Sequence, residues 1–386
     1  MEFRSYLAFF VLAIFSTVVM ADCNYSNSLT QTKLDRLSQD EKRAICALGD
    51  FSQNIDREQA KDVLFEIKSL ERLGSAHAPY VLGQLYIKGW LVDKSYEQGL
   101  THLFTAIKRG SKDAKLYAAK LLFDSEDEEH WEYSYRLFIE LSLDGVVDAI
   151  YGLGLFYENG KYVNKNIEKA ISYYSKAAKL GFVDAHTALG YWYGFGDDEV
   201  KNVRQAKKHL EVAVSRHHAE AKALLGRLLL ANQPSDVELL RAYSLLLAAA
   251  EHGEASAMCD IAKAYYRGHW NDLVSENDAY TYMLKASNMD YYECVHALAY
   301  HHFNGHNYQK SFELFEIAAK RGEFAKSWFA LSMFHFNGVV VQQDYDIGME
   351  YLNKAARLGD SDAIEVIKKL GSGESRSKKR APHLNN

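Results

Sequence analysis

The sequence predicts an all-α fold, a right-handed α-solenoid superhelix built from antiparallel helix pairs. The first observation is a glycine that recurs at a nearly constant interval, since Gly74, Gly110, Gly145 and Gly181 lie 36, 35 and 36 residues apart. The second is that apolar residues after these glycines follow the 3.6-residue period of a helix. The third is that 386 residues include only 3 prolines, whereas a sandwich or barrel with many turns uses more.

The glycine interval predicts eight repeat units. After Gly181 the next glycine in phase is Gly253, two periods later, so that His217 stands at the skipped boundary. The register then continues through Asp290, Gly322 and Gly359. Such a repeat is typical of a solenoid, in which each unit needs its neighbours to bury its apolar face. We therefore expect eight stacked helical hairpins in place of the two or three domains that length alone suggests.

The first helix of each hairpin has a recognisable packing face. In the third unit Ala149, Leu153, Gly154 and Tyr157 stand at i, i+4, i+5 and i+8, on one side of a helix. A glycine inside a helix costs roughly 1 kcal/mol relative to alanine, so close contact with the partner helix is the expected reason for it. These internal glycines are Gly83, Gly154, Gly190 and Gly226. A second glycine is expected to end the helix as a left-handed cap, at Gly89, Gly160, Gly196, Gly268, Gly305 and Gly338.

The second helix repeats the pattern Ala170, Tyr173 or Tyr174, and Ala177-Ala178, in which the small alanines let helices approach. The combined pattern A-x-x-x-L-G-x-x-Y…G…KA-x-x-Y-x-x-KAA-x-x-G resembles the Sel-one-like repeat, a relative of the tetratricopeptide repeat. The resemblance covers residues 75–359. It implies an α-solenoid and a role in assembling or binding other proteins, without naming a partner.

The first 21 residues are interpreted as a signal peptide. Arg4 is followed by an apolar stretch from Tyr6 to Met20, which is too short for a comfortable membrane span, and cleavage is expected after Ala21. The alternative is an uncleaved anchor. The prediction places the protein in the periplasm or outside the cell if the source is bacterial, and in the ER lumen or secreted if it is eukaryotic. No integral span is expected after cleavage.

Atypical helices are expected at both ends of the repeat array, because terminal units must cover an exposed apolar face. Residues 22–74 are assigned to N-terminal capping helices, with apolar residues at Leu34, Leu37, Ile45 and Leu48 and again at Val63, Leu64, Ile67 and Leu70. Residues 360–370 are assigned to a C-terminal capping helix, and residues 371–386 to a disordered basic tail.

Composition and motifs argue against several functions. The balance of 45 basic against 51 acidic residues gives a net charge of −6, which makes nucleic acid an unlikely partner. No catalytic constellation, phosphate loop or cofactor motif is visible. The pairs His217-His218 and His301-His302 make poor metal ligands, because adjacent helical side chains diverge by about 100°. The acidic run 124–129 lacks the ligand spacing of a calcium loop and is interpreted as a solvated loop.

The chain has 4 cysteines, which allow two candidate disulfides. Cys23 and Cys46 form a possible bridge that would anchor the N-terminal segment. Cys259 and Cys294 fall on neighbouring first helices, whose axes are expected roughly 8–10 Å apart. That separation disfavours a bridge, which requires Cα atoms within about 7 Å.

The predicted binding surface is the concave groove formed by the first helices. Tyrosine and arginine are enriched at binding hot spots, and aromatic residues recur at the inward positions beside a few charged residues. The candidate partner-binding residues are Tyr80, Gln84, Tyr151, Glu158, Tyr191, Arg227, Lys263, Tyr266, Tyr300 and Phe303. The alternative for each tyrosine is packing against a neighbouring first helix.

These observations favour an exported repeat scaffold that mediates protein or peptide interaction through its groove, without catalysis or cofactor. The alternative from another class is a protein that binds or hydrolyses cell-wall fragments or β-lactams, like cysteine-rich secreted relatives. This chain lacks the cysteine pair in every repeat that those relatives carry.

Overall fold

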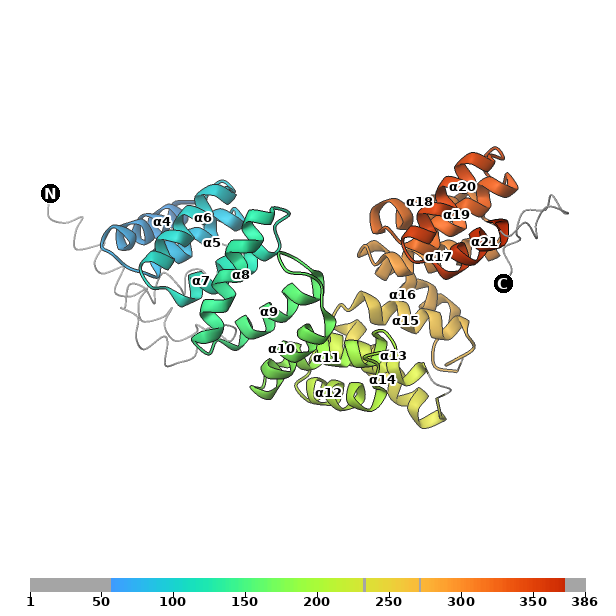
Figure 1. The fold of residues 1–386 in the computed structure, drawn as a ribbon, viewed down its shortest axis with the longest axis horizontal. Coiled ribbons are helices and arrows are strands. Elements are labelled where there is room, and N and C mark those ends of the chain that lie inside the picture. Colours follow the sequence, from blue (N-terminus) through green and yellow to red (C-terminus); the bar gives the residue numbers. More distant parts are fainter. Residues whose placement is uncertain (1–56, 232–233, 271, 372–386) are drawn as a thin grey trace. The chain divides into compact units, whose positions relative to one another are not determined.

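The computed structural model describes residues 57–231, 234–270 and 272–371, and within these ranges it contains eighteen α-helices and no strand (Figure 1). Consecutive helices pack against each other as antiparallel hairpins, eight in number, between a single helix before them and a single helix after them. The predicted all-α solenoid of eight hairpins is therefore confirmed. The chain divides into two compact units, of which the first ends at Phe182 and the second begins at Val183.

Unit 1 contains one leading helix and three hairpins. The leading helix is α4 (Arg57–Arg72), and the hairpins pair α5 (Ala78–Lys88) with α6 (Tyr96–Lys108), α7 (Lys112–Phe123) with α8 (Glu128–Leu143), and α9 (Val147–Asn159) with α10 (Ile167–Lys179). Side-chain caps start several of these helices; the Ser95 hydroxyl, for example, accepts a hydrogen bond from the Gln98 amide at 3.3 Å.

Unit 2 contains five hairpins and one closing helix. The pairs are α11 (Val183–Phe195) with α12 (Val203–Ser215), α13 (Ala219–Leu230) with α14 (Asp236–Glu251), α15 (Ala255–Tyr266) with α16 (Glu276–Asn288), α17 (Tyr292–Asn304) with α18 (Tyr308–Gly322), and α19 (Ala325–Asn337) with α20 (Tyr345–Arg357). The closing helix is α21 (Ser361–Gly371). One continuous hydrophobic cluster runs through these hairpins, as expected for repeats that bury their faces on each other.

The internal glycines lie where the two helices of a hairpin touch, as predicted. A Cβ on Gly154 would lie 2.4 Å from the ring of Tyr174, and one on Gly190 would lie 2.4 Å from Leu210. Gly83 and Gly226 have the same relationship to leucines of their partner helices, at 2.7 Å. No side chain fits at these positions. This explains why glycine occurs inside these helices although it lowers helix stability.

The boundary residues share a left-handed backbone, which confirms the repeat register. The boundary glycines have φ between 78° and 92°, and the two substitutes His217 and Asp290 adopt φ of 61° and 57°. Gly322 is the exception, because Glu323 takes the left-handed position with φ 47°. A left-handed glycine also ends α5, α9 and α19, as predicted.

The predicted left-handed caps at Gly196 and Gly305 are wrong. Gly305 has φ −78°, and the following residue, His306, adopts φ 60° in its place. Gly196 is not among the described glycines with positive φ. Its amide still bonds to the Trp192 carbonyl at 3.0 Å, so the chain leaves α11 by a different turn.

The ends of the array carry the expected helices over the described range. Ile67 of α4 is buried against Leu82 and Leu85 of α5. Ala363 of α21 is buried, and its amide donates a 2.8 Å hydrogen bond to Asp360. The proposed signal segment 1–21, the helix expected around residues 34–48, the Cys23–Cys46 bridge and residues 372–386 of the tail all lie outside the described residues. Among the residues that are described, no helix has the length and apolarity to span a membrane.

Candidate interaction surface

The first helices of successive repeats lie close together in unit 2. The pairs α11 and α13, α13 and α15, and α15 and α17 approach each other more closely than the second helices of the same repeats do. In a curved stack the elements nearer to each other are on the inside of the curve. We call the surface formed by α11, α13, α15 and α17 the inner face.

A buried ion pair joins two of these helices. The Nε atom of Arg227 on α13 donates a 2.7 Å hydrogen bond to Oδ2 of Asp260 on α15. The Asp260 side chain is 7% exposed, and the Arg227 side chain is 28% exposed. A carboxylate this deeply buried requires a charged partner, because removal from water is otherwise very costly. Arg227 therefore stabilises the contact between two repeats and still presents part of its guanidinium at the surface.

Three further side chains extend this pair to α17. Arg227 donates a second hydrogen bond to the Tyr291 hydroxyl at 3.2 Å, and that hydroxyl donates to Glu293 at 2.9 Å. Lys263 donates to Glu293 and lies 3.9 Å from Asp260. Arg227, Asp260, Lys263, Tyr291 and Glu293 thus form one continuous inner-face network across three first helices, with no side chain left without a charged or hydrogen-bonding neighbour.

Burial and neighbouring charges shift the pKa values of three groups in the network. Burial raises the pKa of Asp260, and the Arg227 guanidinium opposes that effect. Burial also acts to raise the pKa of Glu293, but the Lys263 ammonium and the hydrogen bonds from Lys263 and Tyr291 outweigh it and leave that pKa lowered. Burial together with the neighbouring Glu293 raises the pKa of the Tyr291 hydroxyl, in spite of Arg227. Glu293 is therefore ionised and Tyr291 neutral at physiological pH.

Exposed aromatic rings flank the network. Tyr266 is 40% exposed and lies three residues after Lys263 on α15, which places the two side chains on the same helix surface. Its ring packs on His301 of α17 with centroids 5.2 Å apart. Tyr191 of α11 is 42% exposed and packs on Trp192 and Phe195 of its own helix. These two tyrosines are the predicted groove residues with the most accessible rings.

Two other predicted residues of unit 2 serve mainly in packing. The Tyr300 ring lies between His296 and Phe315, with centroid distances of 5.0 and 5.2 Å. Phe303 packs on Tyr308 and on Phe334 and belongs to the margin of the hydrophobic cluster. Tyr300 thus packs on its own helix and on α18, the second helix of its hairpin, whereas Phe303 contacts α18 and the next first helix, α19.

The predicted binding residues of unit 1 form hydrogen bonds and ring contacts with other residues of unit 1. Gln84 donates a 2.9 Å hydrogen bond to the Tyr80 hydroxyl, and the Tyr80 ring packs edge-on against Tyr117 of α7. Tyr151 lies against Tyr174 and Phe182, with centroids 5.1 and 5.2 Å away. Glu158 accepts a hydrogen bond from the Tyr174 hydroxyl. The first group lies on α5 and the second on α9.

Asp260, Tyr291 and Glu293 were not among the binding residues predicted from the sequence. One signal was available for Asp260, which stands three residues after the packing alanine of its repeat. Every other unit has an uncharged residue at this position, namely Val81, Tyr117, Gly152, Ala188, Leu224, Ala297 and Ala330. A carboxylate at an otherwise uncharged position indicates a buried partner. Tyr291 and Glu293 lie at the start of α17, where sequence alone does not indicate which way a side chain turns.

The acidic run at 124–129 has a structural role in the turn before α8. The Asp127 side chain accepts a hydrogen bond from the Glu129 amide at 2.9 Å and caps the helix. The Ser125 hydroxyl is hydrogen-bonded to His130 at 2.8 Å. Over the described part of the chain, no three His, Cys, Asp or Glu side chains come together as a metal site would require.

The hairpin stack, with its paired helices and polar inner face, defines the chain as an α-solenoid repeat protein. A family model described as the Sel1 repeat matches residues 76–111, 147–182, 183–218, 255–291, 293–323 and 327–360, more than half of the chain. The chain therefore belongs to the Sel1 repeat family. The hairpins α7–α8 and α13–α14 lie outside the matched segments and have the same helical pairing.

One of the similar solved structures supports the same fold. A protective antigen from uropathogenic Escherichia coli, displaying an SLR fold, aligns with 89% of this chain and 72% of its own length, at 20% identity and a TM-score of 0.52. A Sel1 repeat protein from Oxalobacter formigenes aligns with 92% of this chain and 93% of its own, at 19% identity and a TM-score of 0.43. No curated protein matches the sequence.

Proposed function

We propose that this chain is an exported, non-catalytic scaffold that binds a protein or peptide partner along the inner face of unit 2. Proteins of the Sel1 repeat family commonly act as protein-interaction scaffolds. The observation that carries the proposal is the inner-face network, which holds two cationic side chains in place beside the exposed ring of Tyr266.

The inner-face network favours binding because its side chains are already held in place, so a partner loses less free energy in immobilising them. A flexible lysine or arginine loses roughly 0.5–1.5 kcal/mol of rotamer entropy when a partner immobilises it. Arg227 and Lys263 are held by carboxylates before any partner arrives. Tyr266 adds a large ring with a hydroxyl at its edge, which is the type of side chain enriched at hot spots. A partner with a carboxylate or backbone carbonyl facing Lys263 and an apolar side chain facing Tyr266 fits this surface.

Photo-crosslinking tests the location of the partner. A photoreactive phenylalanine analogue replaces Tyr266 in one protein and Tyr345, a 57% exposed tyrosine at the start of α20, in a matched control. We expect a discrete adduct from position 266 and none from position 345. We also expect the adduct to be lost when Lys263→Ala is added. Equal adduct formation from positions 266 and 345 would contradict the proposal. So would an adduct from position 266 that persists in the Lys263→Ala variant.

Export is tested separately. The intact mass of protein isolated from its native host is expected to lack residues 1–21. A mass that retains them, in protein recovered from the cytosol, would remove the exported location from the proposal without affecting the inner face.

The alternative, a β-lactam-binding or β-lactam-hydrolysing protein, has less support. The repeats contain two cysteines, Cys259 and Cys294, rather than one pair in each unit. Turnover of a chromogenic β-lactam by the purified protein, abolished by one point substitution, would favour that alternative.

A further inference from the structure

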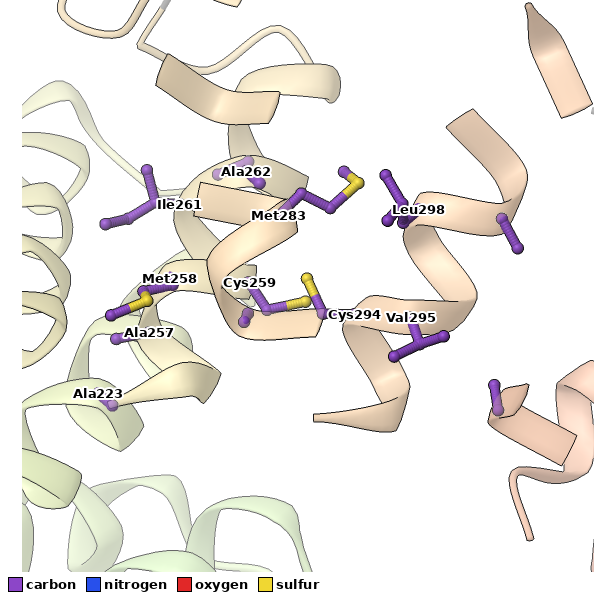
Figure 2. Close-up of a cluster of buried hydrophobic side chains, with 14 of the residues drawn as sticks. Ala223, Ala257, Met258, Cys259, Ile261, Ala262, Met283, Cys294, Val295 and Leu298 are labelled. Carbon is purple, nitrogen blue, oxygen red and sulfur yellow. The ribbon is translucent and has the colours of Figure 1, made fainter. Parts of the chain in front are cut away.

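Cys259 and Cys294 lie face to face between two repeats. Cys259 is on α15 and Cys294 is on α17, both side chains are buried, and both thiols are free. Their sulfur atoms point toward one another (Figure 2). From the expected distance between helix axes, such a pair was disfavoured. That distance takes no account of side-chain direction, and both cysteine side chains point into the interface.

The same register brings another pair together at a later interface. His296 follows Cys294 by two residues, as Cys259 follows the packing alanine Ala257. His296 is hydrogen-bonded at 2.7 Å to Ser327, which holds the packing-alanine position of the next repeat. The side chain two residues after the packing position of one repeat therefore touches the packing position of the next. The cysteine contact is a property of this stacking register.

We propose that Cys259 and Cys294 are the two halves of an inter-repeat disulfide, which joins α15 to α17 when a small-molecule disulfide oxidises the folding chain. The thiolate of one cysteine attacks the small disulfide and releases one thiolate. The second cysteine, deprotonated, then attacks the mixed disulfide and releases the other. Two thiols become one disulfide, two electrons pass to the oxidant, and the two protons go to the released thiolates.

The bond is expected to form during folding. In the folded chain, the hydrogen bond to Cys294 and burial raise the pKa of the Cys259 thiol. The nucleophile in exchange is the thiolate, so a thiol in this environment reacts slowly. While α15 and α17 are still opening and closing, both sulfurs can reach an oxidant, and closure then brings them together.

The disulfide would also fix the inner-face network. Asp260 directly follows Cys259, and Glu293 directly precedes Cys294. Both carboxylates are bonded across repeats, and Lys263 lies within 4.0 Å of each of them. A covalent link between their neighbours would hold α15 and α17 in the register that these contacts require. The proposal itself rests on the thiol geometry and does not depend on the identity of a partner.

The test uses the full chain carrying Cys23→Ser and Cys46→Ser, so that only Cys259 and Cys294 remain. The protein is unfolded in urea with reductant, refolded in a buffer of reduced and oxidised glutathione, quenched in acid, and alkylated under denaturing conditions. We expect a monomer that has lost two hydrogens, takes up no alkylating group, and yields one cross-linked peptide pair containing residues 259 and 294. The matched control adds Cys294→Ala, because alanine occupies this position in other repeats.

The oxidised protein is expected to unfold several degrees above the reduced protein, because a closed loop restricts the unfolded chain. Dithiothreitol should reverse the increase, and the Cys294→Ala control should show none. Two alkylated thiols after oxidative refolding, a bond formed only between chains, or an oxidised monomer that unfolds at a lower temperature would each overturn the proposal.

Discussion

Arg227 and Asp260 form a 2.7 Å ion pair between two repeats, at a position where the preceding repeat has Leu224. The same inter-repeat site in this family member thus holds a leucine in one unit and a carboxylate in the next. A buried leucine needs no polar partner at this site, whereas a buried carboxylate needs the positive charge of Arg227 to offset its loss of hydration. This difference makes the pair a sensitive point of unit 2.

Arg227→Met is expected to destabilise unit 2. Removing one partner of a fully buried ion pair costs roughly 3–5 kcal/mol, but Lys263 lies 3.9 Å from Asp260 and retains part of the attraction. We therefore expect a loss of about 2 kcal/mol in the free energy of unfolding, measured by urea denaturation. The control Arg241→Met removes an exposed pair with Glu211 and should cost less than about 1 kcal/mol.

A second substitution distinguishes the buried charge from lost packing. Asp260→Leu added to Arg227→Met removes the uncompensated carboxylate and supplies the residue of the preceding repeat. We expect the double variant to regain part of the stability lost in the single variant. A double variant less stable than the single one would refute this account of the pair.

Gly154→Ala is expected to destabilise unit 1. Its new Cβ would lie 2.4 Å from the Tyr174 ring, which is fully buried and hydrogen-bonded to Glu158. Overpacking costs roughly 1–3 kcal/mol, whereas alanine gains only about 1 kcal/mol in helix propensity. A net loss of about 1 kcal/mol is expected in thermal or urea unfolding. Gly305→Ala is the control. Gly305 has φ −78°, and an alanine Cβ there would lie 3.5 Å from the nearest atom. The stability of this variant should therefore not fall.

His296 should make unit 2 sensitive to acid. Burial lowers the pKa of His296 from 6.5 to about 3; the Lys326 and Lys263 charges also lower it, and Glu293 opposes them. The unfolded chain therefore takes up a proton below pH 6.5 that the folded chain excludes, so stability falls as the pH decreases from 6.5 toward 3. The slope from this group is at most about 1.4 kcal/mol per pH unit.

His296→Gln tests this assignment, because glutamine keeps a hydrogen-bonding group near Ser327 and does not titrate. Chemical unfolding of the variant at pH 7 and pH 5 should show a smaller difference than the original protein shows. Some acid sensitivity should remain, since burial and His186 lower the pKa of His209 to about 4. An unchanged difference between the two pH values would show that His296 is not responsible.

His218 should have the opposite pH dependence. Its side chain lies 3.2 Å from Asp184, and the hydrogen bond with this carboxylate is the main cause of its raised pKa. The stabilisation is present below the ordinary pKa of 6.5 and is lost as the pH rises through the raised value. Because both groups are partly exposed, Asp184→Asn should cost less than about 1 kcal/mol at pH 6 and close to nothing at pH 9. Equal losses at both pH values would contradict the ion pair.

The repeat register was predictable from local chemistry. His217 and Asp290 were placed at boundaries by counting alone, and both adopt the left-handed backbone that glycine adopts elsewhere. The internal glycines were also predictable, because each repeat encodes its own hairpin contact within about 36 residues. The shift from Gly322 to Glu323 was not predictable. Gly322 is instead required for space, because the ring of Tyr292 on the neighbouring helix lies where a Cβ of residue 322 would be.

The sequence by itself determined the helical hairpin, its repetition and the Sel1 repeat pattern, because these depend on residues close together in the chain. The tertiary structure decided which polar groups meet, because those contacts join side chains about one repeat apart, such as Arg227 with Asp260 and Cys259 with Cys294. Their partners are set by the register in which one first helix lies on the next. A small shift along the helices would separate them, and no pattern within a single repeat specifies that shift.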